Sequence, residues 1–203
     1  MVQPVNVRDG AVDSEAYFTV SRRILWILKE VHDETQSHPE IVDSLRRFAE
    51  LGWLDPHWGH TWRKVAKTSY SLLHPESDWK EWDDHQAIYV PALRFIAAIN
   101  VKKTGGGRAS NPHQLKAAFR ENENRLRAQI TELRPNVVIG GNVLHLFASW
   151  FQRRPTKPGA VFDSWVQDGV VWVNAYHPQY TTCTDRDYSD RVQSAIERSM
   201  QAP

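Results

Sequence analysis

Short apolar runs that end abruptly in polar residues recur along the chain. Five such runs are found, at Arg23–Leu28 (RILWIL), Leu93–Val101 (LRFIAAINV), Asn136–Ile139 (NVVI), Val161–Val166 and Val170–Ala175. Continuous runs of this length are typical of strands that are buried on both faces of a parallel sheet. The last two runs flank a Gln-Asp-Gly turn, which indicates a hairpin.

Segments with helical spacing of their apolar positions lie between these runs. We expect helices over Pro39–Leu51, in the second half of Trp53–Leu73, over Pro112–Leu133 with Asn111 as its cap, over Asn142–Phe151 with Asn142 as its cap, and over Asp187–Met200. Alternating strands and helices favour an α/β fold. The pattern predicts a three-layer α/β/α arrangement around a central, mainly parallel sheet of about four strands.

Polar or turn-forming residues stand where the predicted strands end. Glu30, Asn100, Gly140 and His177 all occupy such positions. In open α/β sheets the ligand crevice lies outside the carboxyl ends of the strands. We therefore expect these four residues to lie along one edge of the sheet and to form one site.

Composition narrows the class of protein. The 203 residues suit a single domain, 1–203, with residues 1–20 as its loosest segment. A net charge of +1 gives no global basic field, so any contact with DNA must come from a local patch. The single cysteine excludes an intramolecular disulfide, and no apolar run is long enough for a membrane span. We expect a cytoplasmic monomer without a membrane contact.

Five segments, in this order, resemble motifs of the uracil-DNA glycosylase superfamily, most closely its thermophile-type branch. They are Leu25–His32 (LWILKEVH), Asp55–Leu73 (DPHWGHTWRKVAKTSYSLL), Ile99–Pro112 (INVKKTGGGRASNP), Leu133–Gly141 (LRPNVVIGG) and Ala175–Gln179 (AYHPQ). The resemblance covers about residues 23–180. It implies a glycosylase-like fold and an enzyme that cuts a deaminated or modified pyrimidine base from DNA and leaves an abasic site.

The resemblance also implies roles for individual residues. Glu30 falls on the acidic residue that helps to activate the attacking water, and Asn100 falls on the asparagine that reads the base. His177 falls on the histidine near the leaving base. His57, with Trp58 beside it, falls on the ring that stacks on the flipped base.

The sequence departs from the family pattern in ways that affect the substrate. Lys29 replaces the glycine and His32 the proline of the first motif, and Gln179 replaces the serine of the last. The four cysteines of an iron-sulfur cluster are absent from a chain with one cysteine, so we expect no cofactor. The base is uracil or a larger one, and these departures indicate a remodelled pocket that makes a bulky modified cytosine, such as the glucosylated hydroxymethylcytosine of phage DNA, a candidate substrate. In the second case the enzyme serves in defence against phage.

The chemistry of glycosidic bond cleavage agrees with these residue types. It needs negative charge near a cation-like sugar and donors near an anionic leaving base. Glu30, with Asp33 as the alternative acid, supplies the charge, and His177 supplies a donor. The Asn100 carboxamide presents one donor and one acceptor to a pyrimidine edge. Lys29 and His32 are the remaining candidates for contact with the base.

Two further segments are candidates for contact with DNA. The loop KKTGGGR offers cations and backbone amides to phosphates, through Lys102, Lys103, Gly106 and Arg108. Gln179 and Tyr180 follow the His-Pro pair and are candidates for the wedge that holds the duplex open.

Two other classes of function remain open from the residues. One is a metal-dependent hydrolase or nuclease, with Glu30, Asp33, Glu34 and His177 around a divalent ion. The other is a non-catalytic binder of modified DNA. The residue pattern itself contains no complete metal site, so we expect no metal.

Overall fold

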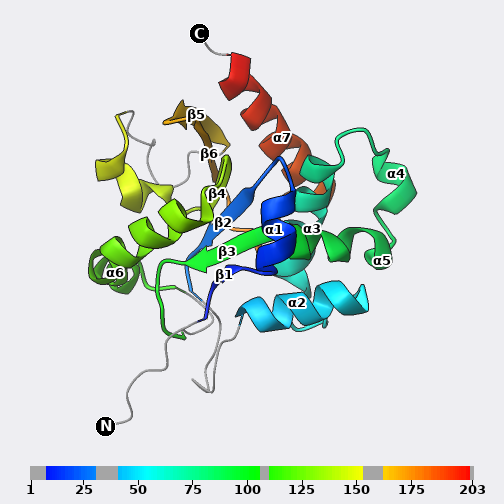
Figure 1. Cartoon of the computed structure of the whole chain (residues 1–203), viewed down its shortest axis with the longest axis horizontal. Helices are drawn as coiled ribbons and strands as arrows, with labels where there is room; N and C mark the ends of the chain where they lie inside the picture. Colours follow the sequence, from blue (N-terminus) through cyan, green and yellow to red (C-terminus); the bar gives the residue numbers. More distant parts are fainter. Residues whose placement is uncertain (1–7, 31–40, 106–109, 153–161, 202–203) are drawn as a thin grey trace.

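Six strands form one sheet in the order β1-β3-β2-β4-β6-β5 (Figure 1). The structure is a computed structural model that describes residues 8–30, 41–105, 110–152 and 162–201. The strands are β1 (Gly10–Ala11), β2 (Ile24–Leu28), β3 (Ile96–Asn100), β4 (Val137–Gly141), β5 (Asp163–Gln167) and β6 (Val170–Ala175). The four central strands are parallel, and β1 and β5 pair antiparallel at the two edges. The predicted mainly parallel sheet is confirmed, but two edge strands extend it beyond the expected four.

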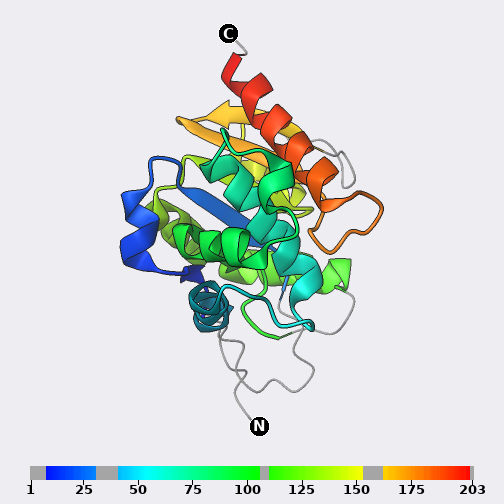
Figure 2. The ribbon, with the colours of Figure 1, turned by 90° about the vertical axis from the view of Figure 1, so that its right-hand side faces the viewer.

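Helices cover both faces of this sheet (Figure 2). The α-helices are α1 (Ser14–Thr19), α2 (Ile41–Leu51), α3 (Gly59–Leu73), α4 (Trp79–Trp82), α5 (Gln86–Tyr89), α6 (Pro112–Leu133) and α7 (Asp185–Gln201), and the 3₁₀ helices are η1 (Val90–Phe95) and η2 (Leu144–Trp150). Side chains of α2, α3 and α7 fill the core on one face, while α6 and η2 fill the core on the other. In the described ranges, no helix combines the length and the apolar character needed to cross a membrane.

The pleat of the strands divides the core into these two halves. In β2, Ile24, Trp26 and Leu28 point into the half that contains α3, whereas Leu25 and Ile27 point into the half that contains α6. Successive side chains of a strand alternate between faces. The position of a residue in this alternation therefore determines which face of the sheet its side chain lies on.

The N-terminal segment is more ordered than the sequence predicted. Residues 10–19 form β1 and α1, and Val12 and Tyr17 are completely buried. The Asp13 carboxylate accepts a hydrogen bond from the Ala16 amide as the cap of α1, and it also pairs with Arg94 at 2.8 Å. The prediction of a loose segment is wrong for residues 8–20, because these long-range contacts are invisible to local periodicity.

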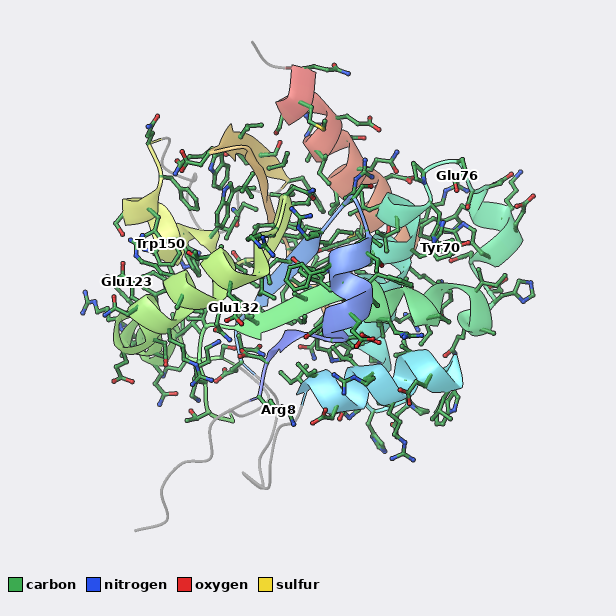
Figure 3. The ribbon with its side chains drawn as sticks, viewed as in Figure 1. Arg8, Tyr70, Glu76, Glu123, Glu132 and Trp150 are labelled. Carbon is green, nitrogen blue, oxygen red and sulfur yellow. The ribbon has the colours of Figure 1, made fainter. Side chains whose placement is uncertain are left out.

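The remaining elements follow the predicted pattern with local differences. The helix over Pro112–Leu133 and its Asn111 cap are confirmed. The second apolar run, Leu93–Val101, however, begins inside η1, and only its later part is the strand β3. Asn142 adopts a left-handed φ of 58° instead of capping a helix, and the segment after it is the 3₁₀ helix η2. In Figure 3 the labelled Trp150 of η2 lies beside Glu123 of α6, which accepts its indole N–H at 2.7 Å.

Candidate functional site

The ends of the four parallel strands lie side by side, as the sequence predicts. Leu28 of β2 is in register with Asn100 of β3, and Gly141 of β4 is in register with Ala175 of β6. The pairing of β2 and β3 continues past their ends, since the Val101 and Lys102 amides donate to the carbonyls of Leu28 and Lys29 at 2.9 Å. Glu30 and Asn100 therefore lie at the ends of the neighbouring strands β2 and β3. His177 follows β6 at the same carboxyl-terminal edge, with β4 between β6 and β2.

Two adjacent lysines follow β3 and have different partners. Asn100 continues the alternation of Ile96 and Ala98, which point into the half of the core that contains α3. Lys102 pairs with Glu30, whereas Lys103 pairs with Gln129 of α6, although both lysines line one pocket beside α6. The two adjacent lysines consequently have different environments, although the sequence gives them the same role.

Glu30 is held in an ion pair. Its Oε2 accepts a hydrogen bond from Lys102 Nζ at 2.9 Å, and the Glu30 side chain is 8% exposed. Lys102, which was predicted to contact phosphate, is instead directed at this carboxylate. The pair fixes the carboxylate in position close to the end of β3.

Asn100 is the most enclosed polar residue of the site. It is 1% exposed, and its carboxamide Nδ2 has no hydrogen-bond partner among the described residues. Its backbone amide donates to the Asp9 carboxylate at 2.7 Å, and this hydrogen bond holds the end of β3 in position. A buried amide donor without a partner is unusual and calls for an explanation.

Lys103 contradicts its predicted role. Its side chain is 2% exposed, and its ammonium donates to Asp9 and to the Gln129 carbonyl oxygen, both at 2.7 Å. Gln129 in turn donates to the other oxygen of Asp9. Burial lowers the pKa of Lys103 and the Asp9 charge opposes this effect. A side chain enclosed in this way holds the β3 end and is not available to a DNA phosphate.

His177 is a neutral donor in this structure. Its Nδ1 accepts a hydrogen bond from the Gln179 amide at 3.2 Å, which places the proton of the neutral ring on Nε2. Burial, with a smaller contribution from the Lys29 charge, lowers the pKa of His177 to about 4. The ring therefore offers an N–H group at neutral pH without carrying a charge.

The low pKa of His177 predicts a pH-dependent stability. Because the folded-state value of about 4 lies below the ordinary 6.5, the unfolded chain takes up the proton first as the pH falls, and stability is lost between these values. We expect unfolding in urea to show that the wild type loses about 2 kcal/mol more than His177→Asn between pH 8 and pH 5. Asparagine keeps an acceptor for the Gln179 amide but does not titrate. Equal losses in the two proteins would contradict the assignment.

Glycine at the end of β4 lets the His177 segment approach the sheet. A Cβ on Gly141 would lie 3.0 Å from Leu28 Cδ2 and 3.2 Å from Pro178 Cδ. The segment then turns, since the Tyr180 amide donates to the His177 carbonyl at 2.8 Å. Tyr180 is 39% exposed and stacks on Tyr176 with ring centroids 4.2 Å apart, and Gln179 is exposed. Gln179 and Tyr180, the two wedge candidates, therefore lie on a turn that this hydrogen bond and the stacking on Tyr176 stabilise.

The aromatic candidates lie at the start of α3. His57 is exposed, and its amide donates to the Asp55 carboxylate. Trp58 is half-buried and packs edge-on against Phe48 at 5.7 Å. The other tryptophans of this region are mostly core, as predicted, with Trp62, Trp79 and Trp82 all buried. His57 is therefore the freer of the two rings.

Several predicted residues lie outside the described part of the chain. These are His32, Asp33 and Glu34 after β2, and Gly106 and Arg108 in the glycine-rich loop. Within the described ranges, no group of three histidine, cysteine or acidic side chains is arranged to hold a metal ion.

The sequence did not point to two residues of this region. His145 follows β4 in η2, and burial together with the Lys29 charge lowers its pKa, so it is a second neutral histidine near Lys29. The positive charge of Lys29, a predicted base contact, helps to lower the pKa of both His145 and His177.

Asp9 is the second such residue. It holds the end of β3 and lies in the segment that was expected to be loose. A charged residue directly before an apolar Gly-Ala-Val run was the only local signal for it.

Comparison with known proteins adds no family to this description. No protein-family model matches the chain, and no curated protein matches it in sequence.

Proposed function

We propose that the protein is a monofunctional DNA glycosylase of the uracil-DNA glycosylase type, which hydrolyses the N-glycosidic bond of an extruded pyrimidine nucleotide. The observation that carries the proposal is the buried, unpartnered Nδ2 of Asn100 at the sheet edge that also holds Glu30 and His177. A carbonyl oxygen of a bound base satisfies such a donor. Without that bond, a buried amide costs about 1–3 kcal/mol of stability.

The charges at this edge fit the transition state of base release. Glycosidic cleavage builds positive charge on the sugar and negative charge on the base. Glu30 supplies a nearly buried carboxylate for the sugar and for an attacking water. His177 supplies a neutral Nε2–H donor, which strengthens its bond to the base as negative charge develops there.

The reaction then runs in a single displacement. Water, oriented by the Glu30 carboxylate, adds to C1′ of the deoxyribose as the bond from C1′ to the base nitrogen breaks. The electron pair of that bond leaves with the base, and the donors of Asn100 and His177 stabilise it. The attacking water passes one proton through the Glu30 carboxylate to the solvent, and the departing base anion takes up one proton from the solvent. The neutral free base and an abasic site remain.

The substrate is proposed from the departures at the same edge. Lys29 adds a cation beside His177 where the related motif has glycine, so the pocket differs from one that is closed tightly around uracil. We propose a modified or deaminated pyrimidine, with uracil and glucosylated hydroxymethylcytosine as the two substrates to compare. Cleavage of the second would place the enzyme in defence against phage.

Base release tests the proposal directly. The protein is incubated in EDTA with duplex and single-stranded DNA that carries uracil, hypoxanthine, hydroxymethylcytosine or glucosylated hydroxymethylcytosine. Free base and alkali-labile abasic sites are then measured. Release of one base in EDTA supports a metal-independent glycosylase. Activity that returns only with a divalent ion would replace it by a metal-dependent hydrolase, and binding without any release would replace it by a reader of modified DNA.

The rate of base release by an Asn100 variant tests whether the Asn100 side chain contacts the base. Asn100→Asp keeps the size of the side chain but replaces the Nδ2 donor with an oxygen. We expect the preferred base to be released about 10²-fold more slowly, because a donor to the leaving base is lost. Asn122→Asp on α6 serves as the matched control, since the bond that Asn122 makes within the described part of the chain goes to the Ala118 carbonyl of its own helix turn. Equal rates for the two variants would remove Asn100 from the site.

A further inference from the structure

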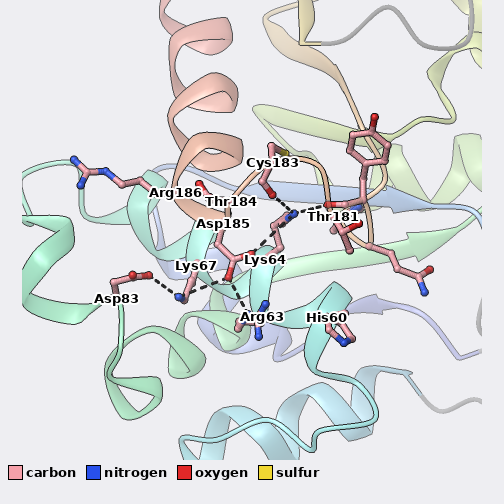
Figure 4. A pocket seen from close by; sticks show the side chains of 13 residues that line it. His60, Arg63, Lys64, Lys67, Asp83, Thr181, Cys183, Thr184, Asp185 and Arg186 are labelled. Atoms are coloured by element: carbon pink, nitrogen blue, oxygen red, sulfur yellow. Dashed lines mark hydrogen bonds and ion pairs between the residues drawn. The ribbon is translucent and has the colours of Figure 1, made fainter.

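A polar pocket lies between α3 and the segment that follows His177 (Figure 4). Its volume is about 440 Å³. It is lined by His60, Arg63, Lys64 and Lys67 of α3, by Asp83, and by Pro178–Thr181 and Cys183–Arg186. The turn that carries Gln179 and Tyr180 thus forms one wall of this pocket.

The pocket has an excess of positive charge. Four of its lining residues are lysine or arginine, and two are aspartate. Asp185 is shared among three cations, with Arg63 at 2.8 Å, Lys67 at 3.6 Å and Lys64 at 4.0 Å, while Asp83 pairs with Lys67. Two carboxylates therefore face four cations, and the remaining positive charge is fixed in a partly enclosed space.

Lys64 adds to this charge and also holds the wall in place. Its side chain is 4% exposed, and its ammonium donates to the carbonyl oxygens of Tyr180 at 2.7 Å and Cys183 at 3.2 Å. Carbonyl oxygens satisfy the hydrogen bonds of an ammonium group but do not neutralise it. The buried charge therefore stays beneath the segment 180–183 and holds that segment in a fixed position.

Free donors remain at the mouth of the pocket. Arg63 is 43% exposed and uses only its Nε toward Asp185, and no acceptor among the described residues meets its two terminal nitrogens. Arg186 is 55% exposed, and among the described residues its ion pair is with Asp190 at 3.7 Å. His60 is exposed. Figure 4 shows the Arg186 side chain extending away from Arg63 and His60, so the two arginines suit different phosphate groups of one strand. The guanidinium of Arg63, beside the fixed positive charge, suits the phosphate in the pocket.

We propose that this pocket is a phosphate-binding subsite, which takes a phosphodiester of the DNA strand beside the extruded nucleotide. The inference rests on the proposed glycosylase function and deepens it. Pro178 and Gln179 line the pocket and follow His177 directly, so a strand whose base lies at His177 passes the mouth of the pocket within one nucleotide. The subsite supplies a phosphate contact of the kind that was predicted for Lys103, whose side chain is buried.

The test measures the affinity for a labelled duplex that carries a non-cleavable abasic analogue, at several salt concentrations. We expect Arg63→Gln to weaken binding about tenfold and to lower the slope of log Kd against log salt by about one. Arg186→Gln, which disturbs no interior contact, should do the same. Arg94→Gln is the matched control, because Arg94 is 46% exposed and is likewise paired with one aspartate.

The outcomes separate the subsite from the proposed function. Binding and salt slopes of Arg63→Gln and Arg186→Gln equal to those of Arg94→Gln would overturn the subsite, even if base release is observed. Loss of affinity in both pocket variants, with no base released by any form, would support the subsite and overturn the glycosylase. Displacement of the duplex by millimolar inorganic phosphate as complete as that by unlabelled DNA would assign the pocket to a free anion and also overturn the proposal.

Discussion

Glu30→Gln is expected to lower the rate of base release by about 10²–10⁴-fold, with little change in the affinity for DNA. Glutamine keeps the shape of the side chain, and its carbonyl oxygen can still accept the hydrogen bond of Lys102. It removes the negative charge that faces the developing sugar cation. It also leaves the Lys102 ammonium, now 2.9 Å from a neutral group, with its positive charge unbalanced in the site.

Single-turnover release of the preferred base, under saturating enzyme, measures this effect on the chemical step alone. Glu132→Gln is the matched control, because Glu132 is exposed on α6 and belongs to neither the edge nor the pocket (Figure 3). A loss smaller than tenfold in Glu30→Gln, with normal folding, would show that Glu30 is only the structural partner of Lys102. Asp33, the other acid of this segment, would then become the candidate.

Much of the fold and of the edge could be predicted because strands that are buried on both faces have a simple local signature. The strands β2 and β4 contain no polar side chain and β6 contains only Asn174, and the polar residues after these strands mark the edge. Parallel pairing then requires these ends to meet, which the register of Leu28 with Asn100 confirms.

The sequence could not distinguish Lys102 from Lys103, because the distinction depends on partners that only the fold brings to them. Lys102 pairs with Glu30, and Lys103 is buried against Asp9 and Gln129. Both partners of Lys103 are far away in sequence. The basic pocket was missed for the same reason, since Lys64 and the segment 180–183 are joined only by the fold.

The connection between Asp9 and Lys103 leads to the largest expected effect on stability. Both side chains are almost completely buried, at 0% and 2% exposure, and Asp9 also accepts from the Asn100 amide and from Gln129. Breaking a buried pair from one side leaves an uncompensated charge. We expect Asp9→Asn to lower the free energy of unfolding by about 3–5 kcal/mol, as measured by urea denaturation at pH 7.

Two further variants show whether the buried charge causes this loss. Asp43→Asn, which removes the partner of the exposed Arg8 at 3.3 Å, should cost less than about 1 kcal/mol. Asp9→Asn/Lys103→Met removes both charges and should regain part of the stability that the single variant loses. A cost for Asp9→Asn as small as that for Asp43→Asn would contradict the burial of the pair.

The direction in which the stability of Asp9→Asn changes with pH shows whether the Lys103 charge causes the loss. Burial already lowers the pKa of Lys103, and without the Asp9 charge that value falls further. As the pH rises toward the ordinary value of Lys103, the folded protein gives up the proton before the unfolded chain does, so the variant gains stability relative to the wild type. A deficit that shrinks between pH 7 and pH 9.5, and does not shrink in the double variant, identifies the Lys103 ammonium as its source. The end of β3, and with it Asn100, would then depend on a charge pair whose two halves lie 94 residues apart.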